Sequence, residues 1–331
     1  MIQRFGSRRP GPKMVHWGSA CGKVILLGEH AVVYGAPALA VGIDRGACAR
    51  ATPCQAGPSR LRVEGWNVVV DDEVMVNDVA KAFQALTASA RRESGDWHAQ
   101  TVEVRADLPP GGGLGCSAAM GVAIARALTP DVDEDEIQRH AMQWERVFHG
   151  NPSGVDSAVA ARGGCIFYRK SEGLEPVRMR ETLRLCIGDS GRSSSTKVMV
   201  DSVARQRLDH PTEVTDVFDG IRTLVFGARA AIEAGDATGL GRLMDQNQLF
   251  LDRLGLSTHA IDRMCSLARS AGALGGKLTG AGGGGSVVAL VPSARIAERV
   301  LAAWRAEGFS GFATSVAVEL QSRTWENEAA P

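Results

Sequence analysis

The sequence predicts a mixed α and β protein with about two domains. Helix-type and strand-type hydrophobic patterns are interleaved along the chain, which is typical of that class. A chain of 331 residues is longer than a single hydrophobic core usually stabilises. Near residue 180 the pattern changes to long helical stretches, so we expect one domain at 1–180 and a second at 181–331.

In the first domain, the apolar run Val24–Leu27 predicts a short strand, and alternation in Thr101–Leu108 predicts a half-buried strand. Apolar residues then recur at helical spacing in Leu114–Leu128. A second helix is expected after the acidic stretch Asp131–Glu136, because acidic side chains favour a helix N-terminus. Its apolar positions continue to Phe148.

The second domain is expected to contain three long helices, a strand, a further helix and a last strand. The helices carry apolar residues at helical spacing, and the first of the two strands is a short apolar run. In chain order the six elements cover Glu213–Ala234, Asp236–Leu254, Thr258–Ala271, Val287–Val291, Ser293–Glu307 and Thr314–Leu320.

The composition limits the class of partner. Lys plus Arg and Asp plus Glu both total 37, whereas a protein that binds nucleic acid or an anionic membrane usually carries a basic surplus. The seven cysteines are scattered without a Cys-x-x-Cys pair, which favours free thiols in a reducing compartment. No apolar run reaches membrane-spanning length, and we expect a cytoplasmic protein. The basic N-terminus around Gly6–Pro12 favours a solvated tail, with an organellar targeting peptide as the alternative.

The glycine-rich stretch Pro109–Ser117 (PPGGGLGCS) follows a predicted strand and opens a predicted helix. Glycines let a backbone approach a ligand closely, and the free N–H groups of a helix N-terminus attract an anion. Ser117 lies in the first helical turn, where its hydroxyl could reach a metal bound to phosphates or simply cap the helix. A tight connection alone rarely needs so many glycines, so the stretch favours phosphate binding.

A second glycine cluster, Gly280–Gly285, matches the spacing of the dinucleotide-binding pattern Gly-x-Gly-x-x-Gly but not its structural context. It precedes an apolar strand, whereas a dinucleotide fingerprint lies between a strand and a helix. A Walker loop at Lys277 fails as well, because Ala271 and Leu278 occupy positions that require glycine and Ser or Thr. Both common nucleotide folds are therefore disfavoured.

Five charged residues are candidates for chemistry, and each also has an ordinary interpretation. Asp156 could cap a helix, Glu145 lies at the edge of an apolar helix face, and Lys23 at a strand entrance is usually solvated. Glu29 and His30 could form a polar turn. Phosphoryl transfer to an alcohol needs a carboxylate for the hydroxyl, a cation for the phosphates and positive charge for the transition state. The joint occurrence of these five residues with a phosphate-binding loop favours phosphoryl transfer.

Three ordered segments resemble the motifs of the GHMP kinase superfamily. They are Cys21–Gly35 (CGKVILLGEHAVVYG), Pro109–Ala119 and Lys277–Ser286, and they span most of the chain. Gly28–Gly35 and His149–Asp156 are similar to the branch of this superfamily that phosphorylates mevalonate. The resemblance implies a two-domain α+β fold, with an N-terminal domain like ribosomal S5 domain 2 and a C-terminal ferredoxin-like α/β domain. In such folds the final strand can return to the first domain.

The resemblance also implies a reaction, which is transfer of phosphate from ATP to mevalonate with Mg²⁺ in isoprenoid biosynthesis. It implies catalytic roles for Asp156 and Lys23 and magnesium ligation by Ser117 and Glu145. The nucleotide-binding residues it implies are Pro110, Gly111, Gly112, Gly113, Leu114, Gly115, Cys116, Ser117 and Ala118. The substrate-binding residues it implies are Lys23, Glu29, His30, Asp156, Thr196, Gly280 and Ala281. Homodimers are common among such kinases, so a homodimer is the expected assembly.

The chain departs from the motifs at three positions. Cys21 replaces a proline, Cys116 replaces the first of two serines, and Ser286 replaces a cysteine. None of these changes removes a group that the chemistry needs. The alternatives are a relative that acts on phosphomevalonate and a non-catalytic sensor with the same fold. The sensor ranks lower because the candidate base and metal ligands are present, and a nicotinamide-dependent oxidoreductase ranks lower still.

Overall fold

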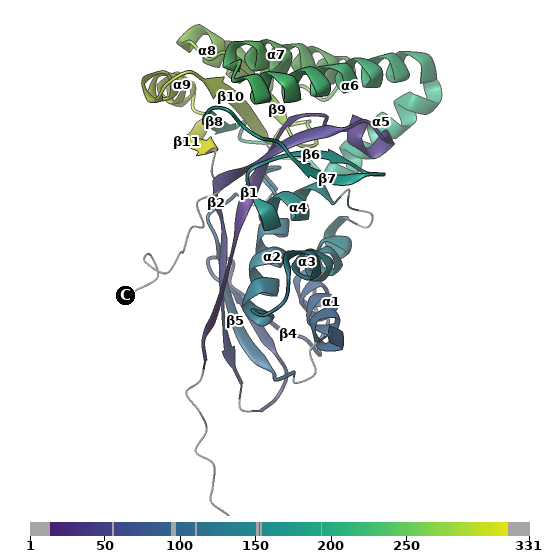
Figure 1. Cartoon of the computed structure of the whole chain (residues 1–331), viewed down its shortest axis with the longest axis vertical. Helices are drawn as coiled ribbons and strands as arrows, with labels where there is room; N and C mark the ends of the chain where they lie inside the picture. Colours follow the sequence, from purple (N-terminus) through teal and green to yellow (C-terminus); the bar gives the residue numbers. More distant parts are fainter. Residues whose placement is uncertain are drawn as a thin grey trace, which may run out of the picture.

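The computed structural model describes residues 14–54, 56–93, 97–109, 111–149, 152, 154–192 and 194–316. Two sheets, each covered by helices, lie one above the other in Figure 1, and the mixed α and β class is confirmed. The N-terminal tail, Pro110 and everything after Val316 lie outside the described residues. Among the described helices, none combines the length and apolarity that crossing a membrane requires.

The first sheet has the strand order β4-β3-β5-β2-β6-β7, with β1 paired to β2. Its strands are β1 (His16–Leu27), β2 (Ala38–Pro53), β3 (Arg60–Val63), β4 (Val68–Asp71), β5 (Gln100–Ala106), β6 (Cys165–Arg169) and β7 (Gly173–Pro176). β1 is longer than the predicted Val24–Leu27, because its small and polar first half is held by antiparallel pairing with β2 from His16 onward. Local hydrophobicity does not reveal a strand that is set by its partner.

Four helices cover one face of this sheet, namely α1 (Asp78–Glu93), α2 (Cys116–Leu128), α3 (Glu134–His149) and α4 (Val155–Arg162) (Figure 1). The predictions of α2 and α3 are confirmed. α2 is buried along almost its whole length, and its small residues allow a close approach to β1. A Cβ added to Gly18 on β1 would lie 2.1 Å from the Ala123 carbonyl oxygen. A short 3-10 helix, η1 (Ala31–Tyr34), connects β1 to β2.

The second sheet has the order β11-β8-β10-β9, all antiparallel. Its strands are β8 (Leu183–Asp189), β9 (Gly275–Thr279), β10 (Ser286–Val291) and β11 (Ser310–Val316). The helices of this part are α5 (Thr196–Asp209), α6 (Pro211–Ala234), α7 (Ala237–Arg253), α8 (His259–Ala271) and α9 (Ala294–Ala306). The predictions of α6 to α9 and β10 are confirmed to within two residues at each end.

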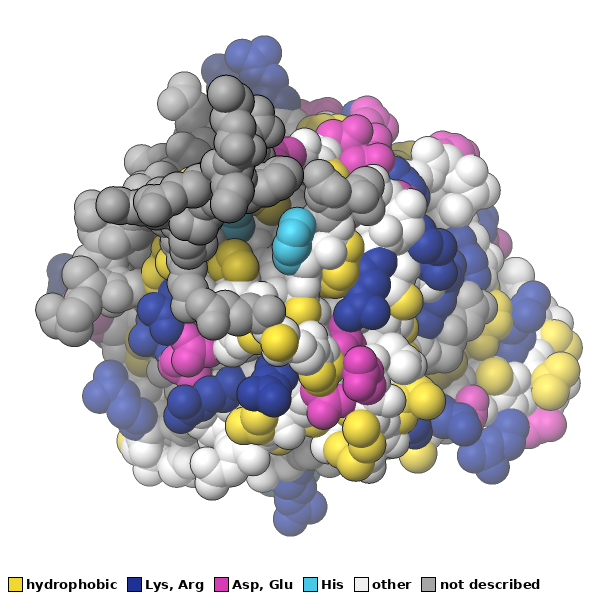
Figure 2. Space-filling view, turned by 90° about the horizontal axis from the view of Figure 1, so that it is seen from below, with side chains coloured by type: hydrophobic (Ala, Val, Ile, Leu, Met, Phe, Trp, Pro, Cys, Tyr) yellow, Lys and Arg dark blue, Asp and Glu magenta, His cyan; other side chains and the backbone are white. Residues whose placement is uncertain are grey.

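The last described strand begins earlier than the predicted Thr314–Leu320 and pairs with β8 of the second sheet. It touches the first sheet through Thr314, whose hydroxyl donates to Asp44 Oδ1 at 2.6 Å. The chain passes from one sheet to the other between Pro176 and Leu183, and the domain boundary near residue 180 stays a prediction. Seen from the lower end of the molecule, acidic and basic side chains are intermixed on the surface (Figure 2).

Candidate active site

The loop between β5 and α2 has the strand-loop-helix arrangement that the sequence predicts. Gly111, Gly113 and Gly115 have φ values of 73°, 75° and 72°, a region that favours glycine. The loop lies against β1, because a Cβ added to Gly115 would be 2.8 Å from Lys23 Cγ. The helix that follows begins at Cys116, so its first N–H groups face the glycine loop, an arrangement that favours an anion.

Lys23 and Asp156 are brought together at this loop. The Lys23 side chain is only 4% exposed, and its backbone N–H donates to the Leu114 carbonyl at 2.9 Å. Lys23 Nζ lies 3.1 Å from Asp156 Oδ1, and the aspartate side chain is 33% exposed. Asp156 lies in the first turn of α4, which begins at Val155 directly after Gly154 with φ 86°. The pair therefore joins a buried cation to a carboxylate that solvent or substrate can reach.

Ser117 and Glu145 form the second pair of the site. The Ser117 hydroxyl donates to Glu145 Oε1 at 2.6 Å and accepts from Trp144 Nε1 at 3.2 Å. The pKa of Glu145 is raised to about 7, mainly by burial and in part by the Asp156 charge, although the Ser117 hydrogen bond and the Lys23 charge act to lower it. Helical spacing left the direction of Glu145 open, and packing of α3 on α2 turns it inward.

Glu29 and His30 form a buried bridge to the second half of the chain. The Glu29 carboxylate pairs with Lys277 Nζ and accepts from Asn247 Nδ2 at 3.2 Å. His30 Nε2 lies 2.8 Å from the Ala281 carbonyl oxygen, and burial lowers the pKa of His30. These residues are therefore more than a polar surface turn, because each contacts a segment about 250 positions away.

The two glycine clusters meet at this bridge. A Cβ on Gly280 would lie 3.3 Å from Gly113 Cα, and Ser286 Oγ donates to the Gly112 carbonyl at 2.6 Å. Ser286, the departure from the third motif, thus ties the two clusters together. Thr196 is an exposed residue at the start of α5. Ser194, two residues earlier, is the side chain that donates to the Gly282 carbonyl.

Three residues that hold the site together were not predicted from the sequence: Asn247, Thr279 and Lys277 as the partner of Glu29. Thr279 Oγ1 accepts from the Ile25 N–H and donates to the Ile25 carbonyl, both at 3.1 Å, and so fastens β9 to β1. One signal was present, because Lys277 lies between glycine and apolar residues where a solvated charge is unusual.

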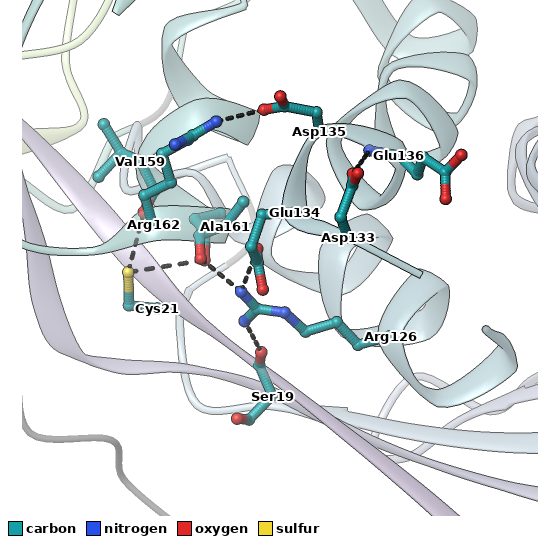
Figure 3. Close-up of polar contacts among 11 residues, drawn as sticks. Ser19, Cys21, Arg126, Asp133, Glu134, Asp135, Glu136, Val159, Ala161 and Arg162 are labelled. Carbon is teal, nitrogen blue, oxygen red and sulfur yellow. Dashed lines mark hydrogen bonds and ion pairs between the residues drawn. The ribbon is translucent and has the colours of Figure 1, made fainter. Parts of the chain in front are cut away.

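Arg126 on α2 was also missed, and it joins the elements that carry the candidate residues (Figure 3). Its guanidinium donates to the Ser19 carbonyl of β1 and the Ala161 carbonyl of α4, and it pairs with Glu134 of α3 at 2.6 Å. The Cys21 thiol, where the motif has proline, adds a contact by donating to the Val159 carbonyl of α4 at 3.2 Å. Arg126 of α2 therefore helps to hold β1, α3 and α4 in their relative positions.

Comparison with known proteins agrees with this architecture. The family model described as GHMP kinases N terminal domain matches residues 76–164, and the one described as GHMP kinases C terminal matches residues 228–310. The chain belongs to the GHMP kinase superfamily.

The relatives that it matches include several mevalonate kinases. The one from Thermococcus gammatolerans is 36% identical over 297 residues, which cover 83% of this chain and 88% of the relative. The one from Pyrococcus horikoshii is 34% identical over 298 residues with the same coverage. The crystal structure of L. major mevalonate kinase in complex with R-mevalonate is 28% identical, covers 94% of this chain and 99% of its own, and has a TM-score of 0.82.

Proposed function

We propose that this chain catalyses the mevalonate kinase reaction, in which the γ-phosphoryl group of ATP is transferred to the 5-hydroxyl of mevalonate. The products are 5-phosphomevalonate and ADP, and the reaction belongs to isoprenoid biosynthesis, from which sterols and other lipids derive. The observation that carries the proposal is the 3.1 Å pair of Lys23 and Asp156 beside the glycine loop. Seven archaeal relatives named mevalonate kinase, 32–36% identical to the chain, support the choice of alcohol.

In this proposal Asp156 accepts the proton of the attacking hydroxyl as the new oxygen–phosphorus bond forms and the bond to ADP breaks. Lys23 Nζ holds the carboxylate in place and stabilises negative charge that develops on the transferred group. Backbone N–H groups of residues 111–118 and the N-terminus of α2 bind the ATP phosphates. Glu29, His30, Thr196, Gly280 and Ala281 are assigned to the surroundings of the alcohol.

Ser117 and Glu145 fit a Mg²⁺ ion. Both supply oxygen, the ligand that Mg²⁺ prefers, and they already lie within 2.6 Å of each other beside the phosphate loop. Glu145 is 2% exposed, and a bound dication would compensate the burial of its carboxylate. When bound, Mg²⁺ neutralises charge on the ATP phosphates.

Replacing Asp156 by asparagine tests the assignment. Asp156→Asn should slow turnover by about 10²- to 10⁴-fold, or roughly 3–5.5 kcal/mol of barrier, while ATP binding and folding persist. Asp78→Asn is a matched control, because Asp78 also lies in a first helical turn but is 66% exposed and far along the sequence from every motif. Near-normal turnover by a folded Asp156→Asn protein would remove Asp156 as the base.

The choice of substrate needs a separate assay. ADP release should be measured with mevalonate and with phosphomevalonate at equal concentrations. We expect ADP release with mevalonate and none with phosphomevalonate. Turnover with phosphomevalonate alone would assign the chain to the other kinase activity, and no turnover with either would favour the non-catalytic sensor.

A further inference from the structure

Two carbonyl groups of the phosphate loop are held by other segments of the chain. The Ser286 hydroxyl at the start of β10 donates to the Gly112 carbonyl at 2.6 Å. The backbone N–H of Lys23 on β1 donates to the Leu114 carbonyl at 2.9 Å. The loop is therefore fixed both from the first sheet and from the second.

Holding a carbonyl also fixes the N–H of the next residue. A trans peptide is planar, and its C=O and N–H point in opposite directions. The described peptide bonds are all trans, so Ser286 turns the Gly113 N–H away from β10 and Lys23 turns the Gly115 N–H away from β1. Neither N–H has a hydrogen-bond partner among the described residues, and both glycines are partly exposed. Both N–H groups are thus available to an anion.

The position of Ser286 is itself set by the second sheet. Ser286 is the first residue of β10, a strand that lies between β8 and β9, and it pairs with Asp189 on one side and Thr279 on the other. The residue is 1% exposed, so its hydroxyl is shielded from competing water. A hydrogen bond in such surroundings keeps more of its strength than one at the surface. The second sheet therefore orients the peptide between Gly112 and Gly113.

This anchor differs from the one that the superfamily motifs provide. The motifs have a serine at 116 and a cysteine at 286, whereas this chain has Cys116 and Ser286. The Cys116 thiol donates to the Leu108 carbonyl, at the start of the loop, at 3.6 Å. A thiol is a weak donor and a hydroxyl a stronger one. Of these two side chains, Ser286 is therefore the stronger anchor of the loop.

We propose that the Ser286 hydroxyl is a positioning group for ATP, which orients the Gly113 N–H toward the nucleotide phosphates. Ser286 acts through the peptide between Gly112 and Gly113 and does not touch the nucleotide. A donor that is already oriented binds an anion without the cost of ordering the loop. The inference rests on the proposed function in one respect, which is that this loop binds ATP. Loss of the hydroxyl therefore weakens ATP binding and leaves mevalonate binding and the chemical step unchanged.

Isothermal titration calorimetry of the full chain, with ATP and with mevalonate separately in a buffer that contains Mg²⁺, tests the proposal. Ser286→Ala should raise the Kd of ATP by about 3- to 10-fold, the effect of one lost hydrogen bond. The Kd of mevalonate and the kcat at saturating ATP should stay within about twofold. Ser286→Cys keeps a weak donor, so its Kd for ATP should lie between those of Ser286→Ala and the unchanged chain.

Thr129→Val is the matched control. It also removes a buried hydroxyl that donates to a carbonyl, that of Ala125 at 2.8 Å, but at the opposite end of α2. Its Kd for ATP should equal that of the unchanged chain.

Full ATP affinity in Ser286→Ala would overturn the inference alone, because the loop would then bind phosphates without this anchor. An equal loss of ATP and mevalonate affinity would also overturn it, since that result indicates a general loosening of the site. If Ser286→Ala did not fold, Ser286→Cys would decide, because cysteine is the usual residue of the motif; full ATP affinity in that variant would overturn the inference. Failure of the unchanged chain to bind ATP would remove the proposed function and the inference together.

Discussion

Replacing Lys277 by methionine should lower the free energy of unfolding by about 3–5 kcal/mol. The magnitude follows from burial, because Lys277 is 0% and Glu29 1% exposed, and their side chains pair between β9 and the turn after β1. Without the ammonium group, the Glu29 carboxylate would remain buried with the Asn247 amide as its remaining polar contact at 3.2 Å. Total stabilities are about 5–15 kcal/mol, so the loss would be a large fraction.

Urea unfolding followed by far-UV circular dichroism measures this loss. The double variant Glu29→Gln with Lys277→Met removes both charges and should recover most of the stability, since a buried pair is worth little more than neutral side chains of similar size. Arg222→Met is the matched control, because its pair with Asp219 is about half exposed on both sides and should contribute less than about 1 kcal/mol. If Lys277→Met lost no more than that control, the buried pair would not hold the two halves of the chain together.

Four further outcomes are expected. Ser117→Ala should reduce turnover, and raised Mg²⁺ should partly restore it; a defect that ignores Mg²⁺ would make Ser117 a helix cap. Gly115→Ala should lower kcat by about 10- to 100-fold, because its Cβ would meet the lysine of the site at 2.8 Å, whereas Gly65→Ala, with a similar φ of 77° and open space, should retain full activity. Arg126→Lys should lower kcat more than it changes KM, since it loosens three elements of the site at once, and equal loss in both would contradict that role. Burial holds the pKa of His140 below its ordinary value of 6.5. As the pH falls, the unfolded chain therefore protonates this histidine at a higher pH than the folded chain does. Stability measured by urea unfolding should therefore fall as the pH drops below about 6.5, and the fall should be smaller in His140→Gln.

Local sequence patterns determined several helices, the glycine loop and the choice of motif residues. The helices α2 and α6 to α9 were predictable because their apolar periodicity acts within a few turns of chain. The glycine loop was predictable because left-handed φ values near residues 111–115 need glycine wherever they occur. The segments around Lys23, Asp156 and Ser117 are enough to predict these three residues without any contact between them, and their chemical roles remain predictions.

Tertiary structure decided how those pieces meet. Helical spacing left Glu145 at the edge of a face, and only packing against α2 directs it to Ser117. The sequence could not show that Lys277 reaches Glu29, 248 positions away, or that Thr279 fastens β9 to β1 across 254 positions. Such contacts depend on which surfaces become neighbours when the sheets form, and no local pattern records that. The sequence alone determined which groups could bind and transfer a phosphate, and the fold decided that they lie together.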